Sequence, residues 1–185
     1  MTEQYKKYTL KSIGVAIFAF CIRCLLSKTK IIGEFSVYDV YGYAGEAIAF
    51  ATIVMILYEK YIWKFNLFEK TPVLMKSYTG TLKSTYDGVE RVAKLTIKQT
   101  LLSVSVVMET GESKSKAVSA AIENIQDEWQ LTYTYLNVPD ANVRDRSAIH
   151  YGTALLSIED PVLIKGQYFT DRKTIGDMKF EAINQ

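Results

Sequence analysis

Two apolar segments near the start of the chain constrain its fold more than any other feature. The first is "YTLKSIGVAIFAFCIRCLLS" (8–27), the second covers about 40–60, and their strictly uncharged centres are 12–22 and 47–58. A helix of about 20 apolar residues crosses roughly 30 Å of hydrocarbon. The uncharged centres are shorter than that, which leaves open two helices buried in a protein core.

Three observations favour membrane spans. Both segments are apolar around most of their circumference rather than along one stripe. Side chains that prefer the membrane interface stand at their ends, among them Lys11, Tyr58 and Trp63. The rest of the chain has the pattern of an independent core, so it offers nothing to bury two such helices. We therefore expect residues 1–69 to hold two transmembrane helices and a connecting loop.

Arg23 and Glu46 lie inside the expected spans. The favoured interpretation puts Arg23 within reach of the interface and Glu46 near the start of the second helix. The alternative is a polar contact between helices, within or between subunits. Ionisable groups at membrane depth cost roughly a few kcal/mol unless they pair or reach the interface.

Lysines flank the outer ends of the two segments. They are Lys6, Lys7 and Lys11 before the first segment, and Lys60, Lys64 and Lys70 after the second. Because basic residues gather on the cytoplasmic side, we expect a multi-pass protein of the bacterial inner membrane with both termini in the cytoplasm. Cys21 and Cys24 form a C-x-x-C pair inside the first segment, and we interpret them as packing residues because a redox pair needs a helix N-terminus beside a sheet.

From about residue 78 the pattern changes to short alternating segments separated by turns. In "VAKLTIKQT" (92–100), Ala93, Leu95 and Ile97 alternate with polar residues. Their β-branched and aromatic content predicts half-buried strands. The other segments of this kind are 78–87, 101–110, 128–137, 149–158, 162–169 and 176–183. Residues 70–77 are the expected linker, and 78–185 the expected second domain.

The stretch 113–125 fits either a helix or a strand. Counted as a strand it gives eight, joined by short turns, which is typical of an antiparallel meander that closes into a β-barrel. Polar residues on both faces of several strands, such as Thr96 and Ser103, favour an interior that holds a polar ligand. The expected fold class is a membrane protein with two N-terminal transmembrane helices followed by an antiparallel eight-stranded meander β-barrel.

Motifs for catalysis are missing from the sequence. His150 is the single histidine, and without His or Cys neighbours it cannot build a zinc site. The chain has neither a phosphate-binding glycine loop before a helix nor a nucleophile elbow. A net charge of +2 without a basic tail argues against a nucleic acid polymer as partner. We expect a membrane-anchored binding module that is not an enzyme and uses no metal or cofactor.

Four motifs then give the chain a family likeness. In order, "QTLLSVSVVMETGESKS", "LTYTYLNVP", "IHYGTALLSI" and "LIKGQYFTDRKTIGDMKF" follow the two spans. This arrangement resembles the SMODS-associated two-transmembrane β-strand-rich effectors of CBASS antiphage systems. The resemblance implies a β-barrel that binds a cyclic nucleotide made by a partner nucleotidyltransferase (CD-NTase) after phage infection, and the expected ligand is a cyclic dinucleotide. It also implies self-association in the lipid bilayer, membrane disruption and death of the infected cell.

The residues fit such a ligand. Tyrosine rings stack on bases, at about 1–3 kcal/mol per base, and Arg172 offers a planar fork for phosphate. Thr110, Ser113 and Ser115 flank a glycine turn and can present hydroxyls at a barrel mouth. The ligand-binding candidates are Thr110, Ser113, Tyr133, Tyr135, Asn137, His150, Tyr168, Arg172 and Thr174. The structural alternatives are tyrosines that merely fill the barrel and an ion pair between Asp171 and Arg172.

Three functions remain open on the sequence. The first is a ligand-gated membrane effector. The second is a membrane-tethered carrier for an apolar ligand, and the third is a barrel that only docks a partner. Polar groups pointing inward favour the first, an aliphatic interior the second, and a filled barrel with an exposed apolar patch the third.

Overall fold

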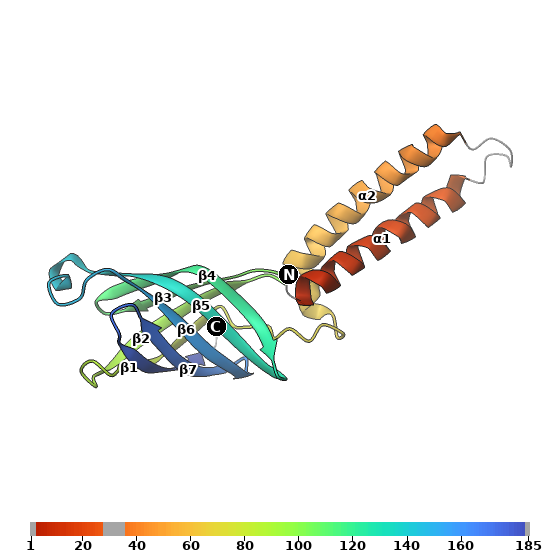
Figure 1. Cartoon of the computed structure of the whole chain (residues 1–185). Coiled ribbons are helices and arrows are strands. Elements are labelled where there is room, and N and C mark those ends of the chain that lie inside the picture. The colour runs from red at the N-terminus through yellow and green to blue at the C-terminus, as the bar shows by residue number, and fades with distance from the viewer. Residues whose placement is uncertain (1–2, 28–35, 184–185) are drawn as a thin grey trace. The chain divides into compact units, whose positions relative to one another are not determined.

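The computed structural model describes residues 3–27 and 36–183, and the chain forms two compact units, residues 1–69 and 70–185. The first unit holds α1 (Glu3–Ser27), α2 (Val37–Lys60) and the short 3₁₀ helix η1 (Ile62–Phe65). The second holds eight strands and the short 3₁₀ helix η2 (Ala141–Val143). Figure 1 shows the helices of the first unit and the barrel of the second.

The α1–α2 hairpin is a pair of long helices that pack along each other. Ser36 starts α2 with a capping box, because its hydroxyl accepts from the backbone of Tyr38 and Asp39 accepts from the backbone of Ser36, both at 3.2 Å. The buried residues of α2 are Ala47, Ala51 and Met55, four positions apart on one stripe. Small residues such as these two alanines let two helix backbones approach closely.

Both helices are longer than predicted, since α1 begins at Glu3 and α2 at Val37. Each is long and apolar enough to cross a membrane by length and composition. The favoured interpretation of Glu46 was wrong, because α2 starts nine positions earlier and the Glu46 carboxylate accepts a hydrogen bond from Arg23 Nε at 2.6 Å. The alternative, a polar contact between helices, describes the hairpin. Most of the predicted connecting loop lies outside the described residues.

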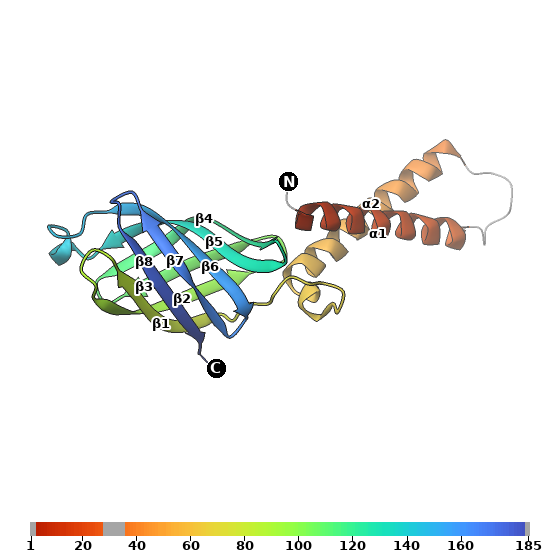
Figure 2. The same ribbon diagram turned by 60° about the horizontal axis from the view of Figure 1, so that its bottom comes forward.

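The second unit is a closed barrel in which every strand runs antiparallel to its neighbours (Figure 2). Each strand pairs with the next along the chain, and β1 pairs with β8 to close the ring. The strands are β1 (Ser77–Ser84), β2 (Glu90–Gln99), β3 (Val104–Thr110), β4 (Ser113–Ile125), β5 (Glu128–Pro139), β6 (His150–Asp160), β7 (Leu163–Thr170) and β8 (Ile175–Ala182). The predicted arrangement of two long helices followed by an eight-stranded meander barrel is confirmed, and the ambiguous stretch 113–125 is strand β4.

Two predicted strands were too long, since 78–87 runs past the end of β1 at Ser84 and 101–110 starts before β3. The segment 101–110 begins as a turn, in which the Thr100 backbone N–H donates to Ser103 O at 2.8 Å, and β3 starts only at Val104. The first residues of this apolar run therefore belong to the turn between β2 and β3. Leu101 is buried in that turn although it is not part of a strand.

Apolar side chains fill one end of the barrel. Tyr78 is fully buried there, and its hydroxyl donates to Pro161 O at 2.6 Å and accepts from the Met75 backbone at 2.9 Å. Pro161 lies in the β6–β7 turn and Met75 precedes β1, so this tyrosine ties the elements that meet at the filled end. The fully buried aliphatic and aromatic residues of this core include Leu95, Leu131, Leu156, Ile164 and Phe180.

Candidate functional site

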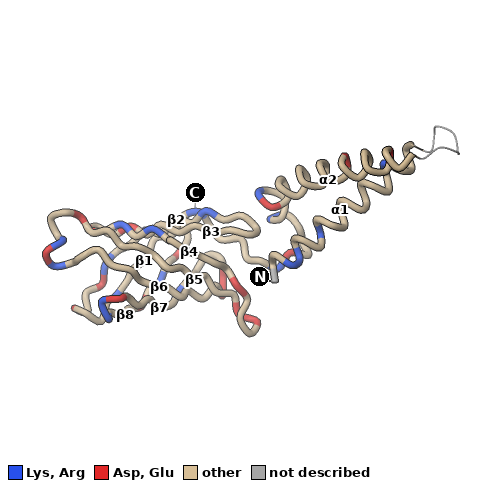
Figure 3. The backbone as a smooth tube through the Cα atoms, turned by 45° about the horizontal axis from the view of Figure 1, so that its top comes forward, with Lys and Arg blue, Asp and Glu red and all other residues tan. Residues whose placement is uncertain are grey.

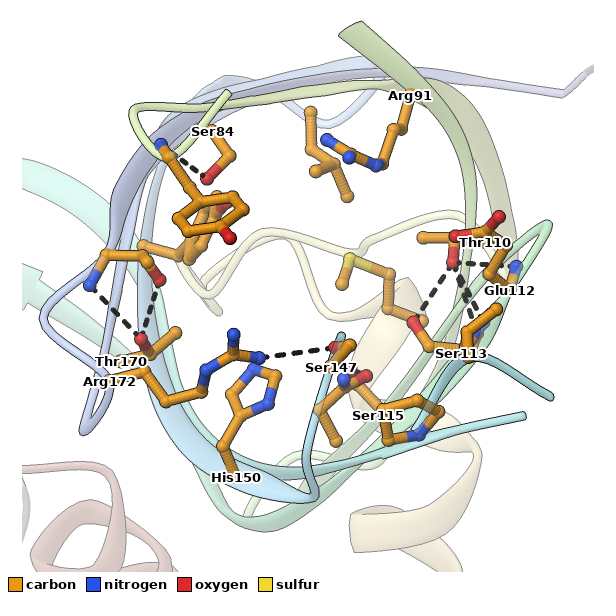
Figure 4. A pocket seen from close by; sticks show the side chains of 18 of the residues that line it. Ser84, Arg91, Thr110, Glu112, Ser113, Ser115, Ser147, His150, Thr170 and Arg172 are labelled. Carbon is orange, nitrogen blue, oxygen red and sulfur yellow. Dashed lines mark hydrogen bonds between the residues drawn. The ribbon is translucent and has the colours of Figure 1, made fainter. Parts of the chain in front are cut away.

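A cavity of about 270 Å³ opens at the other end of the barrel. Its walls come from four places that are distant in sequence: the β1–β2, β3–β4, β5–β6 and β7–β8 connections with the strand ends beside them. In a meander, alternate turns fall at the same end, which is why these four meet. Figure 4 shows side chains from around the ring pointing toward a shared space.

Ser115 and Asn137 form a buried polar pair in the cavity wall. The two residues are partners across β4 and β5, and the Ser115 hydroxyl donates to Asn137 Oδ1 at 2.8 Å. Ser115 is 2% exposed and Asn137 is 7% exposed. A buried amide held by its oxygen keeps two N–H donors with a fixed direction. This pair therefore offers polar recognition below the rim.

Two tyrosines line the cavity because glycines stand beside them. Tyr135 is paired with Gly152 on β6, and Tyr168 with Gly176 on β8. A Cβ at Gly152 would come within 2.5 Å of the Tyr135 ring, and a Cβ at Gly176 would meet the Tyr168 ring as closely. Glycine in a strand interior often marks such a close approach. Burial raises the pKa of Tyr135, and the nearby Tyr168 and Asp171 raise it further, so its hydroxyl stays protonated and can donate.

Charged residues stand at the rim. Arg91 forms an ion pair with Asp87, whose hydrogen bonds lower the pKa of that carboxyl to about 2, chiefly through the guanidinium. Arg146 pairs with Glu112 at 2.6 Å. Arg172 instead donates to the neutral Ser147 hydroxyl at 3.2 Å.

Hydroxyl pairs brace two of the turns. Thr110 and Ser113 are 3.0 Å apart across the β3–β4 turn, and Thr170 and Thr174 are 2.7 Å apart across the β7–β8 turn. The alternative that Asp171 pairs with Arg172 was wrong, because the Asp171 carboxylate accepts from the Tyr151 backbone at 3.1 Å while Arg172 reaches Ser147. The β7–β8 turn therefore presents the guanidinium inward.

Eight of the nine predicted ligand residues line this cavity. They are Thr110, Ser113, Tyr135, Asn137, His150, Tyr168, Arg172 and Thr174. His150 also places Nδ1 at 2.9 Å from Ala148 O, which orients its ring. The convergence of these residues is a fact of the fold, whereas their contact with a ligand stays a prediction.

Tyr133 is the exception, because it lies one inward position deeper than Tyr135. It is 1% exposed, its ring centroid is 5.7 Å from that of Tyr135, and it is absent from the cavity wall. Its buried hydroxyl has no hydrogen-bond partner within the described part of the chain. Tyr133 thus belongs to the packed core. For this residue the structural alternative is right, in which a tyrosine only fills the barrel.

Sequence reasoning missed several residues of the wall. Arg91 and Asp87 come from the first hairpin, and Arg146, Ser147 and Glu112 from two other turns. A signal was present, because a meander of eight strands gathers its first, third, fifth and seventh connections at one end. Applying that rule to the predicted strands would have added the charged residues of these turns.

The fold and the cavity define a small receptor-type meander barrel preceded by a helical hairpin. Residues 69–182 match the family model described as the Cap15 cyclic dinucleotide receptor domain. Over 141 residues the chain is 30% identical to CD-NTase-associated protein 15 of Staphylococcus schleiferi. The aligned region covers 74% of this chain and 76% of that protein. The chain therefore belongs to the Cap15 family, and its resemblance to CBASS effectors is confirmed.

Among solved structures, a redesigned β-barrel covers 60% of this chain and 92% of its own, with a TM-score of 0.47 and 8% sequence identity. At that level the likeness bears on neither ligand nor partner.

Proposed function

We propose that this chain is a CBASS effector whose barrel binds a cyclic dinucleotide in the mouth cavity. Binding drives self-association of the helical hairpins in the inner membrane, and the membrane is then disrupted. The observation that carries the proposal is a cavity with a buried polar pair in its wall, Ser115 and Asn137, beneath a rim of three arginines. Membership of the Cap15 family supports the class of ligand.

The arginines suit a ligand with two phosphates. Arg91 and the Arg172–Ser147 pair lie on opposite sides of the cavity in Figure 4. A guanidinium has five N–H donors, and the Ser147 contact uses one side of Arg172, so the remaining donors are free to meet phosphate oxygens. Arg91 is anchored by Asp87, which fixes its direction while leaving its charge near the rim.

The bases and riboses find partners at two depths. Tyr86 is 72% exposed at the rim and offers a ring for stacking. The protonated hydroxyl of Tyr135 and the amide of Asn137 offer donors below it. A cavity of about 270 Å³ is close to the lower limit of about 300 Å³ for sites that enclose a small ligand, so the ligand fills the cavity and extends over the rim.

The other two functions fit this cavity less well. An apolar carrier would need an aliphatic interior, whereas the cavity holds charged, amide and hydroxyl groups. A docking barrel would be filled throughout, whereas here the apolar core stops beneath an open cavity at the mouth.

A ligand acts on the helices only through its different affinity for the separate and assembled states. Shifting the population from about 1:99 to 99:1 takes roughly 10⁴-fold, or about 5.5 kcal/mol. Stacked bases and charge-assisted phosphate contacts in two or more subunits supply free energy of that order.

The test is a binding screen of the full chain in detergent, by calorimetry, against cyclic di- and trinucleotides. Arg172→Ala should weaken binding of the cognate ligand by about 10-fold or more, as loss of a charged hydrogen bond does. Lys165→Ala is the matched control, because it removes one positive charge from β7 at a residue paired with Glu159 outside the cavity. No nucleotide binding, or equal losses in the two variants, would refute the proposed site.

Membrane disruption needs a separate measurement in cells that make the cognate nucleotide. Permeability to a membrane-impermeant dye should rise on induction, and Arg172→Ala should abolish the rise. Replacing residues 44–58 by an unrelated apolar helix should leave binding intact and abolish permeability. Killing by the helix-replaced protein, or permeability without nucleotide, would leave a tethered binding protein as the better description.

A further inference from the structure

Two polar clusters join α1 to the elements around it at different heights of the hairpin. In the first, Lys11 Nζ donates to the Tyr58 hydroxyl at 3.0 Å and to the Glu69 carboxylate at 3.1 Å. In the second, Arg23 Nε donates to the Glu46 carboxylate at 2.6 Å, and the guanidinium lies 4.3 Å from the centroid of the Tyr43 ring. We call them the Lys11 cluster and the Arg23 cluster.

The spacing between the clusters is the same on both helices. Twelve positions separate Lys11 from Arg23 on α1, and twelve separate Glu46 from Tyr58 on α2. At a rise of 1.5 Å per residue, each interval is about 18 Å long. No Asp, Glu, Lys or Arg lies within either interval, and Figure 3 shows this uncoloured stretch between charged positions.

Aromatic residues mark nearly the same two levels. Tyr38, Tyr41 and Tyr43 lie near the Arg23 cluster, whereas Tyr58 and Trp63 lie at the other end. Tyrosine and tryptophan concentrate at membrane–water interfaces. From Tyr43 to Tyr58 there are fifteen positions, so the aromatic limits enclose about 22 Å.

The Arg23 cluster is only half covered by protein. The Arg23 side chain is 40% exposed and that of Glu46 is 59% exposed. Charges exposed to hydrocarbon are unfavourable, whereas the headgroup region hydrates them. The exposure therefore favours an interface at the level of Arg23 and Glu46 over a position deep in lipid.

We propose that the α1–α2 hairpin has an apolar layer about 18–22 Å thick, well short of the roughly 30 Å of bilayer hydrocarbon, and that it acts on the membrane by thinning it. This inference rests on the proposed membrane function, and it names the physical process by which the membrane would be disrupted. A short hydrophobic segment is accommodated by local thinning, by snorkelling side chains or by oligomerisation. Tilting gives no relief, because it shortens the thickness that a helix covers.

The ion pair makes the short layer a fixed property of the hairpin. Arg23 and Glu46 hold each other, so neither can move deeper or shallower without the other. When several hairpins assemble, their thinned zones merge, and lipid packing is weakest where the assembly is largest.

The first test is leakage of a trapped dye from phosphatidylcholine vesicles that contain the full chain, measured after addition of the cyclic nucleotide that the binding screen identifies. The vesicles differ only in acyl length, with monounsaturated chains of about 14, 18 and 22 carbons. Because the cost of mismatch rises with every ångström, leakage per inserted chain should rise about tenfold from the shortest to the longest lipid. Leakage independent of acyl length would overturn the inference.

A pair of double variants separates charge depth from general damage. Arg23→Leu with Glu46→Leu lengthens the apolar layer on both helices, so leakage in long-chain lipid should fall about tenfold toward the short-chain level. Arg23→Glu with Glu46→Arg restores an ion pair at the same height and should leak as the wild-type chain does. Equal leakage by the two double variants would contradict the role of the Arg23 cluster.

Cysteine labelling locates the interface directly. In a chain carrying Cys21→Ser and Cys24→Ser, we compare Leu26→Cys, beyond Arg23, with Phe18→Cys, inside the apolar interval. Both native side chains are similarly exposed, at 64% and 66%. A membrane-impermeant maleimide offered on both sides of the membrane should label position 26 and spare position 18. Protection of position 26 would mean that hydrocarbon extends past the Arg23 cluster, and the inference would fail.

The failures are distinguishable. If the full chain is extracted from vesicles by alkaline carbonate, it does not span them, and the proposed membrane function fails with this inference. If the chain stays inserted and binds nucleotide but leakage does not depend on acyl length, only the thinning inference fails.

Discussion

The ring of Tyr135 rests against Gly152, its partner across β5 and β6, so closely that a Cβ at 152 would lie 2.5 Å from both the ring and its hydroxyl. The same Cβ would lie 3.0 Å from the backbone oxygen of Phe169 on the next strand. The missing side chain of residue 152 thus sets where the tyrosine can lie, and with it the shape of the cavity.

Gly152→Ala should therefore affect both stability and binding. Neither the Tyr135 ring nor the β7 backbone can yield without cost, so we expect a loss of about 1–3 kcal/mol in the free energy of unfolding. Nucleotide affinity should fall as well, because the ring is pushed into the cavity. Gly111→Ala is the control, since a Cβ there meets nothing within 4 Å. Thermal unfolding and calorimetry measure the two effects, and an unchanged Gly152→Ala protein would contradict this account.

Tyr133→Phe should be neutral or stabilising. The Tyr133 hydroxyl is buried without a hydrogen-bond partner in the described part of the chain, and such a group costs about 1–3 kcal/mol. Removing it should leave nucleotide affinity unchanged, because the residue is outside the cavity wall. Tyr135→Phe should instead lower affinity. A loss of affinity in Tyr133→Phe would show that ligand reaches deeper than the cavity described above.

The Asp87–Arg91 pair predicts a pH effect on stability. The folded pKa of Asp87 is about 2, below its ordinary value of 3.8, so its contribution is present above pH 4 and is lost as pH falls toward 2. The melting temperature of the wild-type protein should therefore fall more between pH 5 and pH 2 than that of Asp87→Asn. Arg91→Ala should show the same reduced dependence, because it breaks the pair from the other side. If the melting temperatures of all three proteins fell equally with pH, the Asp87–Arg91 pair would not be the cause of the pH effect.

Residues 70–185 should fold without the helices. They form a closed barrel with its own core, in which every strand pairs with a neighbour on each side. A protein of these residues should be soluble, monomeric and β-rich by circular dichroism, whereas the full chain should need detergent. Aggregation or a helical spectrum of the shorter protein would contradict two independent units.

Periodicity made most of the fold predictable. The alternation of Ala93, Leu95 and Ile97 is a local property, and so is the length of the apolar helices. The stretch 113–125 stayed ambiguous because its alanines suit either structure. What decides it is pairing with β5, a tertiary effect that includes an irregularity between Ala117 and Ser119.

The candidate site was partly predictable for a related reason. Tyr135 and Asn137 share a strand face, so alternation alone put them together, but it could not say how deep the cavity reaches and therefore included Tyr133. The contact of Arg23 with Glu46 was weighed but not favoured, because the start of α2 depends on the cap at Ser36, which lies outside the apolar pattern.

Closure of the barrel between β1 and β8 also orders events during synthesis. Tyr78 pairs with Ala182, more than 100 positions later, so a chain still growing on the ribosome has no ring and no cavity. Contacts so distant in sequence form slowly, whereas a helix needs only its own neighbours. α1 and α2 are complete before any strand exists. A newly made molecule therefore cannot bind its ligand until β8 has been translated and has paired with β1.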